Sequence, residues 1–393
     1  MNFDFDSQVN RLGSGSYKWD SHEESDVLPM WVADMDFRTA PPIIEALRRR
    51  VEHGVFGYTY VPNEYYDSVI RWFGDRHGWD IKREWFIYTS GVVPALSAII
   101  KALAEPGNKV IAQTPAYNCF FSSIRNNGCE LAPNDLIYRD GTYTIDYNNL
   151  EMLASDPKAK ILLLCNPHNP SGRVWTPEEL RRIGEICMRH GVTVVADEIH
   201  CELVYPPHRY TPYGSLGEEY RATSVSCVSP SKAFNTAGLQ IADIITANDS
   251  MRRRIDRAIN INEVCDVNPF GVVATIAAYN EGLPWLNALN EYLYGNYCML
   301  VDELGRNVPF VRVVPLEGTY LAWIDVKSTG TPCETICDML LRDEHLRLNP
   351  GTMYGSGGEG FLRLNLAAPR SVVADAVSRL IRLLTKIAPH QQF

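Results

Sequence analysis

The sequence predicts an α/β fold in which a mainly parallel sheet is sandwiched by helices and a smaller α+β domain is attached. Apolar runs of strand length alternate with helical segments up to Gly282, and parallel strands need such crossover helices. Beyond Gly282 this alternation stops. The chain has 393 residues, which suits two domains. We expect an N-terminal arm that also forms part of the small domain (residues 1–42), a large domain (43–282) and a small C-terminal domain (283–393).

Local patterns place the elements of the large domain. Pro41-Pro42 stands at the start of a helix that we expect to end at His53, and Ser90-Gly91 opens a helix to about Leu103. Apolar and β-branched runs predict the strands. The further helices are expected at 64–74, 118–126 and 178–190, and the strands at 85–89, 109–112, 161–165, 192–196 and 223–228.

The two ends of the chain differ from this pattern. The first forty or so residues show no sustained periodicity, so we expect an extended arm with a short strand. After residue 282 the sequence predicts a long helix to about Leu304, followed by short strands and helices. These strands are expected at 311–315, 320–325 and 360–365, and the helices at 333–342 and 372–386.

Composition excludes several classes of function. The chain carries 37 basic and 47 acidic residues, and its basic clusters, at 48–50 and 252–254, are typical of solvated helix faces, so we expect no nucleic-acid partner. No apolar stretch reaches the roughly 20 residues of a membrane span, and residues 1–10 lack the apolar run of a secretion signal. We therefore expect no membrane association. The ten cysteines include no Cys-x-x-Cys pair, which predicts reduced thiols in a cytoplasmic protein and no metal site.

Three predicted strands end in polar side chains. Asn169 lies in the turn-rich stretch after 161–165, Asp197 directly follows 192–196, and Lys232 lies in a short turn after 223–228. Ligands of open α/β sheets bind at the carboxyl ends of the strands, where these side chains are expected to meet. Each has an ordinary alternative: an Asx-turn residue for Asn169, a helix cap or ion pair for Asp197, and a solvated loop lysine for Lys232.

Together the three side chains form a chemical set that suits pyridoxal 5'-phosphate. An amine in a desolvated pocket loses proton affinity and forms a Schiff base with a carbonyl. A carboxylate keeps a pyridine nitrogen protonated and an amide bonds a ring oxygen, which lets the cofactor act as an electron sink. Gly91 begins a helix whose first backbone amides offer a phosphate site. We therefore expect Lys232 to be catalytic and the large domain to bind the cofactor.

Several motifs carry a family resemblance. Asn-Pro-x-Asn-Pro-x-Gly at 166–172, Asp-Glu-Ile-His at 197–200 and Ser-x-Ser-Lys at 229–232 resemble the aminotransferase class I/II superfamily, over nearly the whole chain. Finer phrases resemble its carbon–sulfur β-lyase branch, often called the MalY/PatB group; they lie at 18–20, 29–37, 53–58 and 165–170. The resemblance implies a fold like that of aspartate aminotransferase, an amino acid substrate and a homodimer.

The resemblance also implies roles for single residues. Asp197 would pair with the pyridine nitrogen and Asn169 with the 3′ oxygen, while Tyr117 would stack on the ring, with a core tyrosine as the alternative. The phosphate ligands would be the backbone amides of Gly91, Val92 and Val93 and the hydroxyls of Ser229 and Ser231.

Two positions depart from the family pattern. His200 stands where many relatives have a tyrosine that bonds the same oxygen, and a packed histidine is the alternative. Gln240 stands where aminotransferases usually have an arginine near the phosphate. The resemblance implies that Tyr58 compensates by reaching over from the neighbouring subunit, so the site would be complete only in a dimer.

Arg363 is the predicted substrate ligand. It lies on an apolar strand, where a guanidinium needs an anion, and its planar fork matches an α-carboxylate. An internal salt bridge is the alternative. The resemblance implies that the backbone amide of Ala33 lines the same pocket and that Asn169 also contacts the substrate.

Two reactions suit such a site. After Lys232 removes the α-proton as general base, a β-thiolate can leave, which yields pyruvate and ammonia, or the amino group can pass to a 2-oxo acid. An aminotransferase commonly needs a second cationic side chain for a dicarboxylate, and we identify none. The branch-specific phrases favour β-elimination from cystathionine, cysteine or a related thioether. Aminotransfer is the alternative, and an additional regulatory role through protein binding is less favoured.

Overall fold

A seven-stranded sheet lies at the centre of the protein in this computed structural model, which describes residues 3–21, 26–263 and 266–388. Among its described strands, β10 alone runs antiparallel to its neighbours, so the predicted mainly parallel sheet is confirmed. In spatial order the strands are β2 (Phe86–Thr89), β10 (Ala242–Ile245), β9 (Ser224–Val228), β8 (Thr193–Asp197), β7 (Ala159–Cys165), β3 (Lys109–Thr114) and β4 (Glu130–Asp135).

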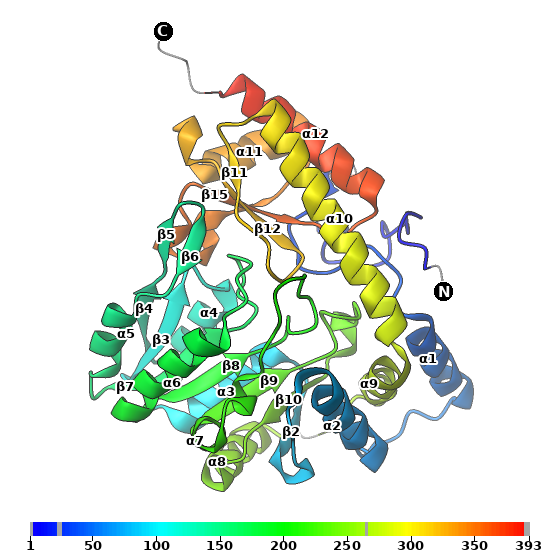
Figure 1. Cartoon of the computed structure of the whole chain (residues 1–393). Coiled ribbons are helices and arrows are strands. Elements are labelled where there is room, and N and C mark those ends of the chain that lie inside the picture. The colour runs from blue at the N-terminus through cyan, green and yellow to red at the C-terminus, as the bar shows by residue number, and fades with distance from the viewer. Residues whose placement is uncertain (1–2, 22–25, 264–265, 389–393) are drawn as a thin grey trace.

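Helices cover both faces of this sheet because its strands are apolar on both sides. In β7, Ile161 and Leu163 pack into the cluster that includes residues of α3, α4 and α8, whereas Leu162 and Leu164 pack on the opposite face with α5 and α6 (Figure 1). The helices of these two layers are α3 (Val92–Leu103), α4 (Asn118–Asn126), α8 (Asp249–Asn260), α5 (Tyr147–Ala154) and α6 (Pro177–His190), with the short α7 (Glu218–Ala222) beside β9.

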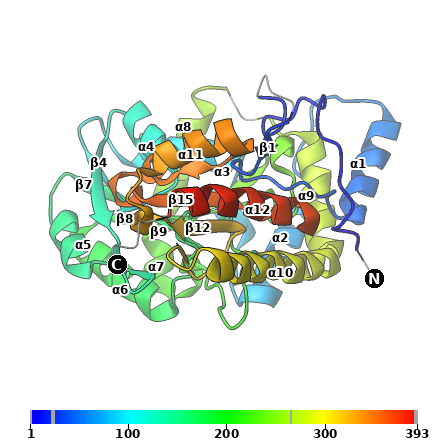
Figure 2. The same cartoon turned by 90° about the horizontal axis from the view of Figure 1, so that it is seen from above.

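A second, four-stranded sheet is built from the C-terminal part of the chain, in the order β11-β12-β15-β14. The long helix α10 lies beside α12 along this part of the molecule, as both views show (Figures 1 and 2). The elements are α10 (Leu283–Asn307), β11 (Arg312–Val313), β12 (Leu321–Asp325), α11 (Cys333–Glu344), β14 (Asn349–Pro350), β15 (Phe361–Asn365) and α12 (Arg370–Lys386).

The N-terminal arm joins the two sheets. Its strand β1 (Leu28–Pro29) pairs in parallel with β13 (Leu346–Arg347), and the chain then passes to α1 (Pro41–His53). Helices α1 and α2 (Asn63–His77) both pack against α9 (Pro269–Glu281). The arm therefore brings residues 31–37 close to both the C-terminal sheet and the central sheet.

Several elements differ from the sequence prediction. The prediction omitted α9, which is buried on many sides (Val272, Ala274, Thr275 and Ala278) and so lacks an amphipathic pattern. It also omitted β4, α5 and β10, and it indicated α8 only through the helix face at 252–254. Strand β4 contains Pro133, which a strand at the edge of a sheet tolerates because its missing amide need not join the ladder.

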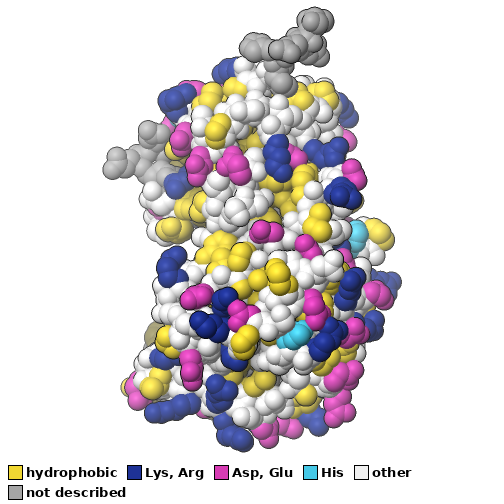
Figure 3. All heavy atoms as spheres, turned by 90° about the vertical axis from the view of Figure 1, so that its left-hand side faces the viewer, with side chains coloured by type: hydrophobic (Ala, Val, Ile, Leu, Met, Phe, Trp, Pro, Cys, Tyr) yellow, Lys and Arg dark blue, Asp and Glu magenta, His cyan; other side chains and the backbone are white. Residues whose placement is uncertain are grey.

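The surface carries both charges. On the face shown in Figure 3, basic and acidic side chains are interspersed and no large patch of one sign forms. Within the described ranges, no helix is both long enough and apolar enough to cross a membrane. The described cysteines are all free, and most of them are buried.

Candidate active site

A cavity of about 200 Å³ lies at the carboxyl ends of β7, β8 and β9. These strands are neighbours in register, with Cys165 beside Asp197 and Asp197 beside Cys227, so the turns that follow them converge. The predicted residues that line the cavity are Ala33, Gly91, Val92, Val93, Tyr117, Asn169, Asp197, His200, Ser231 and Lys232. Ser229, Arg363 and Tyr58 are not among the described lining residues.

The Lys232 amine points at a backbone carbonyl rather than a carboxylate. Its Nζ donates a hydrogen bond to Ala33 O at 2.5 Å. Burial lowers the pKa of Lys232 to about 8, because desolvation disfavours the charged amine; the charge of Asp34 opposes this effect and that of Arg363 adds to it. A substantial share of the amine is therefore neutral, and able to act as a nucleophile or base, near pH 8.

Asp197 is a buried carboxyl at the end of β8, with 4% of its surface exposed. Its Oδ1 accepts a hydrogen bond from the Ile199 amide at 3.2 Å, and no described residue forms an ion pair with it. Burial raises its pKa to about 6, although the Ile199 amide and the charge of Lys232 both act to lower it. The carboxyl is thus poised to accept a cationic partner.

Arg363 and Asn169 meet at the edge of the cavity. Arg363 Nη1 donates to Asn169 Oδ1 at 3.2 Å and Nη2 donates to Trp31 O at 2.8 Å. The guanidinium also lies over the Tyr354 ring, 4.9 Å from its centroid. Its Nε is buried without a hydrogen bond, and no described carboxylate forms an ion pair with Arg363. The predicted alternative of an internal salt bridge is therefore not what the structure shows.

The N-terminus of α3 faces the cavity with free backbone amides. The first helical hydrogen bond is donated by the Ala95 amide to Gly91 O, so the amides of Val92 and Val93 precede the helical ladder and Pro94 has none. Ser231 lies in the lining. Ser229 instead supports the turn, since its Oγ lies 2.7 Å from Ile241 O and 2.9 Å from Ser231 Oγ.

His200 and Tyr117 are two aromatic residues in the lining of the cavity. Burial lowers the pKa of His200 to about 3, so its imidazole is neutral, and its Nδ1 has no hydrogen bond. Burial raises the pKa of Tyr117 above its ordinary value, so the phenol stays protonated. Both side chains therefore present uncharged rings to a bound group.

Tyr58 lies away from the cavity of its own chain. It is 97% exposed, on the segment between α1 and α2. Val55, Phe56 and Tyr60 on the same segment are also exposed, at 64%, 55% and 80%. Such a run of exposed apolar side chains is unusual for an isolated monomer.

Tyr320 is a contact of this site that the sequence did not reveal. Its side chain is buried, and its hydroxyl donates to Ala33 O at 2.9 Å, so it shares this acceptor with Lys232. The residue stands 88 positions after Lys232 (320 − 232), at the start of a predicted strand. Nothing in its local pattern distinguishes it from a core tyrosine.

These residues fit the predicted pyridoxal 5'-phosphate. The buried Asp197 carboxyl, which forms no ion pair with a described residue, offers a partner for a protonated pyridine nitrogen. The amides at the start of α3 offer donors for the phosphate, and the Lys232 amine is desolvated. A carboxyl, an amine and a helix N-terminus around one cavity form the donor set that this cofactor requires.

Comparisons with known proteins agree with this site. A family model described as aminotransferase class I and II matches residues 11–380. The chain is 41% identical over 380 residues to cystathionine beta-lyase PatB of Bacillus subtilis, covering 96% of this chain and 98% of that protein. It is 34% identical to protein MalY of Escherichia coli, covering 98% of this chain and all of that protein.

The fold of this chain also matches that of a solved structure. The crystal structure of cystalysin from Treponema denticola, described as containing a pyridoxal 5'-phosphate cofactor, matches with a TM-score of 0.95 and 34% identity. The match covers 98% of this chain and all of that chain. The predicted fold, related to that of pyridoxal-phosphate enzymes, is therefore confirmed.

Proposed function

Because the chain belongs to the aminotransferase class I and II family, we propose that it is a pyridoxal-phosphate-dependent carbon–sulfur β-lyase. It takes up one water and releases a thiol, pyruvate and ammonia from cystathionine, cysteine or a related thioether amino acid. The observation that carries the proposal is the pairing, around one cavity, of a desolvated Lys232 amine with a buried Asp197 carboxyl that has no ion-pair partner among the described residues. The similarity to a cystathionine beta-lyase selects the reaction.

Asp197, Asn169 and the start of α3 would hold the cofactor, which when bound supplies an electron sink for charge that develops on the substrate α-carbon. Asp197 would stabilise the positive charge on the ring nitrogen, and Asn169 would bond the ring oxygen with its amide. Tyr117 would stack on the ring and His200 would lie beside it. Gly91, Val92, Val93 and Ser231 would surround the phosphate, and Ser229, proposed from the sequence as a further phosphate ligand, would support Ser231 from outside the cavity lining.

Arg363 would orient the substrate. Its guanidinium has an unbonded Nε and no ion pair with a described residue, so an incoming α-carboxylate supplies the missing anion. Arg363 donates to Asn169 and to the backbone carbonyl of Trp31, and Ala33 two residues further lines the cavity. This anchor places the substrate α-carbon at a fixed distance from the Lys232 amine.

Lys232 would then move the proton. A neutral amine with a pKa near 8 removes the proton from the substrate α-carbon, and the resulting ammonium can return a proton to the sulfur of the departing thiolate. Lys232 is half-buried in the cavity lining, and its amine is held there by the hydrogen bond to Ala33 O. Elimination then requires no second basic group.

The cavity gives little support to aminotransfer. Among the described residues that line it, Lys232 is the one cationic side chain, since His200 is neutral, and Arg363 at its edge is the cation proposed for the substrate α-carboxylate. A dicarboxylate acceptor would need a further cation for its distal carboxylate. The observed lining suits a substrate with a single carboxylate next to the reacting carbon.

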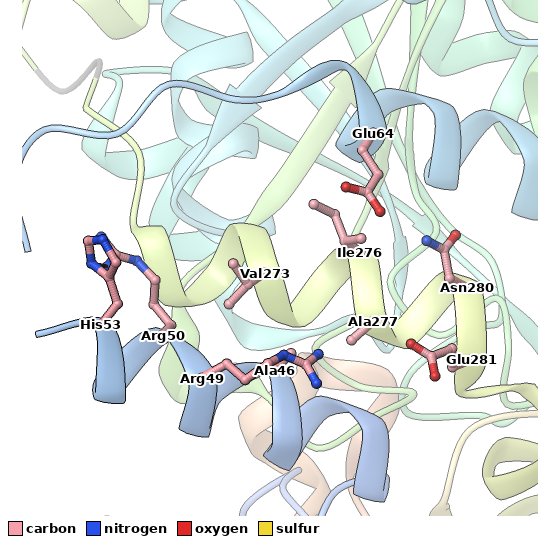
Figure 4. A pocket seen from close by; sticks show the side chains of 10 residues that line it. All are labelled: Ala46, Arg49, Arg50, His53, Glu64, Val273, Ile276, Ala277, Asn280 and Glu281. Atoms are coloured by element: carbon pink, nitrogen blue, oxygen red, sulfur yellow. Dashed lines mark hydrogen bonds between the residues drawn. The ribbon is translucent and has the colours of Figure 1, made fainter. Parts of the chain in front are cut away.

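A homodimer would complete the site. We propose that Tyr58 enters the cavity of the neighbouring subunit and bonds the cofactor phosphate, where Gln240 lies in place of an arginine. In support, the exposed segment that carries Tyr58 leaves α1 beside a groove between α1 and α9. Arg50 and His53 lie at one end of this groove and Glu281 lies at the other end (Figure 4). Residues 1–42, 43–282 and 283–393 would form the arm, the large domain and the small domain of each subunit, in the cytoplasm.

The deciding experiment measures the products of cystathionine with the purified, cofactor-loaded protein. Pyruvate and free thiol should appear in equal amounts, with no requirement for a 2-oxo acid. A parallel assay with 2-oxoglutarate measures glutamate. Glutamate without pyruvate would make the protein an aminotransferase and overturn the proposal.

A further inference from the structure

Residues 31–37, here called the strap, cross the space between the catalytic lysine and the substrate arginine. Side-chain amides hold the strap from both sides. On the side of the C-terminal sheet, Asn365 Nδ2 donates to Val32 O and to Asp34 O, both at 2.6 Å. Asn365 stands two residues after Arg363, on the same strand β15.

Asn235 holds the strap on the side of the central sheet. Its Oδ1 accepts from the Met35 amide at 3.0 Å, and its Nδ2 donates to Met35 O at 3.0 Å and to Phe37 O at 2.9 Å. All three hydrogen bonds go to strap backbone. Asn235 stands three residues after Lys232, in a turn that is closed by the bond from the Thr236 amide to Ser231 O.

The backbone of Asn235 is adapted to this task. Its φ is 52°, a left-handed conformation that asparagine tolerates better than most residues. In this turn the side-chain amide of Asn235 reaches the strap backbone. The same turn therefore fixes both the lysine and the residue that holds the strap.

The strap in turn meets the lysine amine. Ala33 lies between Val32 and Asp34, whose carbonyls Asn365 holds, and two residues before Met35, which Asn235 holds. The Ala33 carbonyl accepts from Lys232 Nζ and from Tyr320 Oη. A carbonyl fixed on both sides along the chain has little freedom to follow the amine. The position of Lys232 therefore depends on where the strap lies.

We propose that Asn235 is a positioning residue, which holds the strap so that the Ala33 carbonyl fixes the Lys232 amine at the substrate α-carbon. Its kinetic consequence rests on the proposed function. Its effect on the amine does not, because the Lys232–Ala33 hydrogen bond belongs to the protein alone.

The test uses Asn235→Gly, which removes the amide but keeps a residue that accepts positive φ. Asn248→Ala is the matched control, since Asn248 also bonds backbone with both ends of its amide, at Met251 and Ala222, outside the cavity. Full-length, cofactor-free protein is labelled with acetic anhydride across a pH series. The acylation of Lys232 is then measured by peptide mass spectrometry.

We expect the midpoint of Lys232 labelling to rise by about 0.5 pH unit or more in Asn235→Gly, because a loosened strap admits water to a desolvated amine. The midpoint should not move in Asn248→Ala. In the loaded enzyme, kcat should fall about tenfold or more while KM changes less than about threefold. If Asn235→Gly does not fold, Asn235→Ser, which removes the amide without adding a charge, should show a rise in the same direction.

An unchanged labelling midpoint would overturn the proposal, even if stability falls as in the control. A rise in KM at constant kcat would also overturn it, because Asn235 would then act on substrate binding. If the proposed function is wrong, cystathionine yields no pyruvate, but the labelling shift still reports on Asn235.

Discussion

Arg363 Nη1 and Asn169 Oδ1 lie 3.2 Å apart and join the C-terminal sheet to the loop after β7. The bond links the residue proposed to hold the substrate carboxylate to the residue proposed to hold the cofactor ring. Substrate anchoring and ring orientation are thus set by one contact, and a change at Arg363 is expected to affect both.

Replacing Arg363 by lysine should raise KM for cystathionine by about 10–100-fold, because a lysine retains the charge but loses the planar fork. The bond to Asn169 is lost as well, so kcat should fall by a smaller factor. Initial rates over a range of cystathionine concentrations separate the two effects. Arg306→Lys, at an exposed position, is the control and should leave both constants unchanged. An unchanged KM in Arg363→Lys would remove Arg363 from substrate binding.

Replacing Lys232 by alanine should lower kcat by about 10²–10⁴-fold or more, since the general base is removed. A small primary amine such as ethylamine, added to the assay, should restore part of the activity because it fits the space left by the side chain. The rescue should depend on the concentration of neutral amine and therefore increase with pH. Lys158→Ala, at an exposed position, controls for nonspecific effects of the amine. Restoration of equal size in both variants would contradict the assignment.

The sequence predicted the parts of the site that follow strands. Asn169, Asp197 and Lys232 each stand just after an apolar run, and the position of parallel strands brings such residues to one edge. The contacts of the strap could not be predicted from local sequence patterns. Asn235 and Asn365 look like ordinary turn and strand residues, and their common partner at 32–37 lies about 200 and 330 positions away, as 235 − 35 and 365 − 34 show.

The N-terminal arm shows the same limit. Lys18 was noted only as part of a family phrase, yet it is buried and its Nζ lies 2.7 Å from Asp36 Oδ2. Arg11 joins the same cluster, with ion pairs at 2.7 Å to Asp34 and Asp36. In the sequence, these scattered charged residues have the pattern of solvent-exposed side chains. Only the fold shows that Arg11 and Lys18 hold the strap through ion pairs with Asp34 and Asp36.

Asp197→Asn should stabilise the cofactor-free protein while it abolishes tight cofactor binding. Burial raises the pKa of Asp197 to about 6, whereas the unfolded chain has the ordinary value of 3.8. Between these values the unfolded state has already lost the proton that the folded state keeps, so stability falls as pH rises from about 4 to about 6 and then stays constant. The asparagine avoids this loss, which amounts to about 3 kcal/mol for a shift of about two units.

Urea unfolding of both cofactor-free proteins at pH 4, 6 and 8 measures this difference. The extra unfolding free energy of Asp197→Asn over the parent should be near zero at pH 4 and near its full value at pH 6 and 8. Asp256→Asn, on the exposed face of α8, should show no such dependence. If the difference in unfolding free energy between Asp197→Asn and the parent is the same at pH 4 and pH 8, the Asp197 carboxylate is not destabilised by burial and the prediction is wrong.

Mixing two damaged subunits tests the shared site. If Tyr58 serves the neighbouring cavity, a dimer of one Lys232→Ala chain and one Tyr58→Ala chain contains one intact site, built from the lysine of the second chain and the tyrosine of the first. Random reassociation makes half of all dimers mixed, so activity should recover to about a quarter of the parent value. The measurement is pyruvate release at low cofactor concentration, after unfolding and refolding the mixture together. Tyr60→Ala, exposed on the same segment, should be active before mixing, and with Lys232→Ala should give only the sum of the separate activities. A mixture of the first pair that stays as inactive as its components would place Tyr58 outside the neighbouring site.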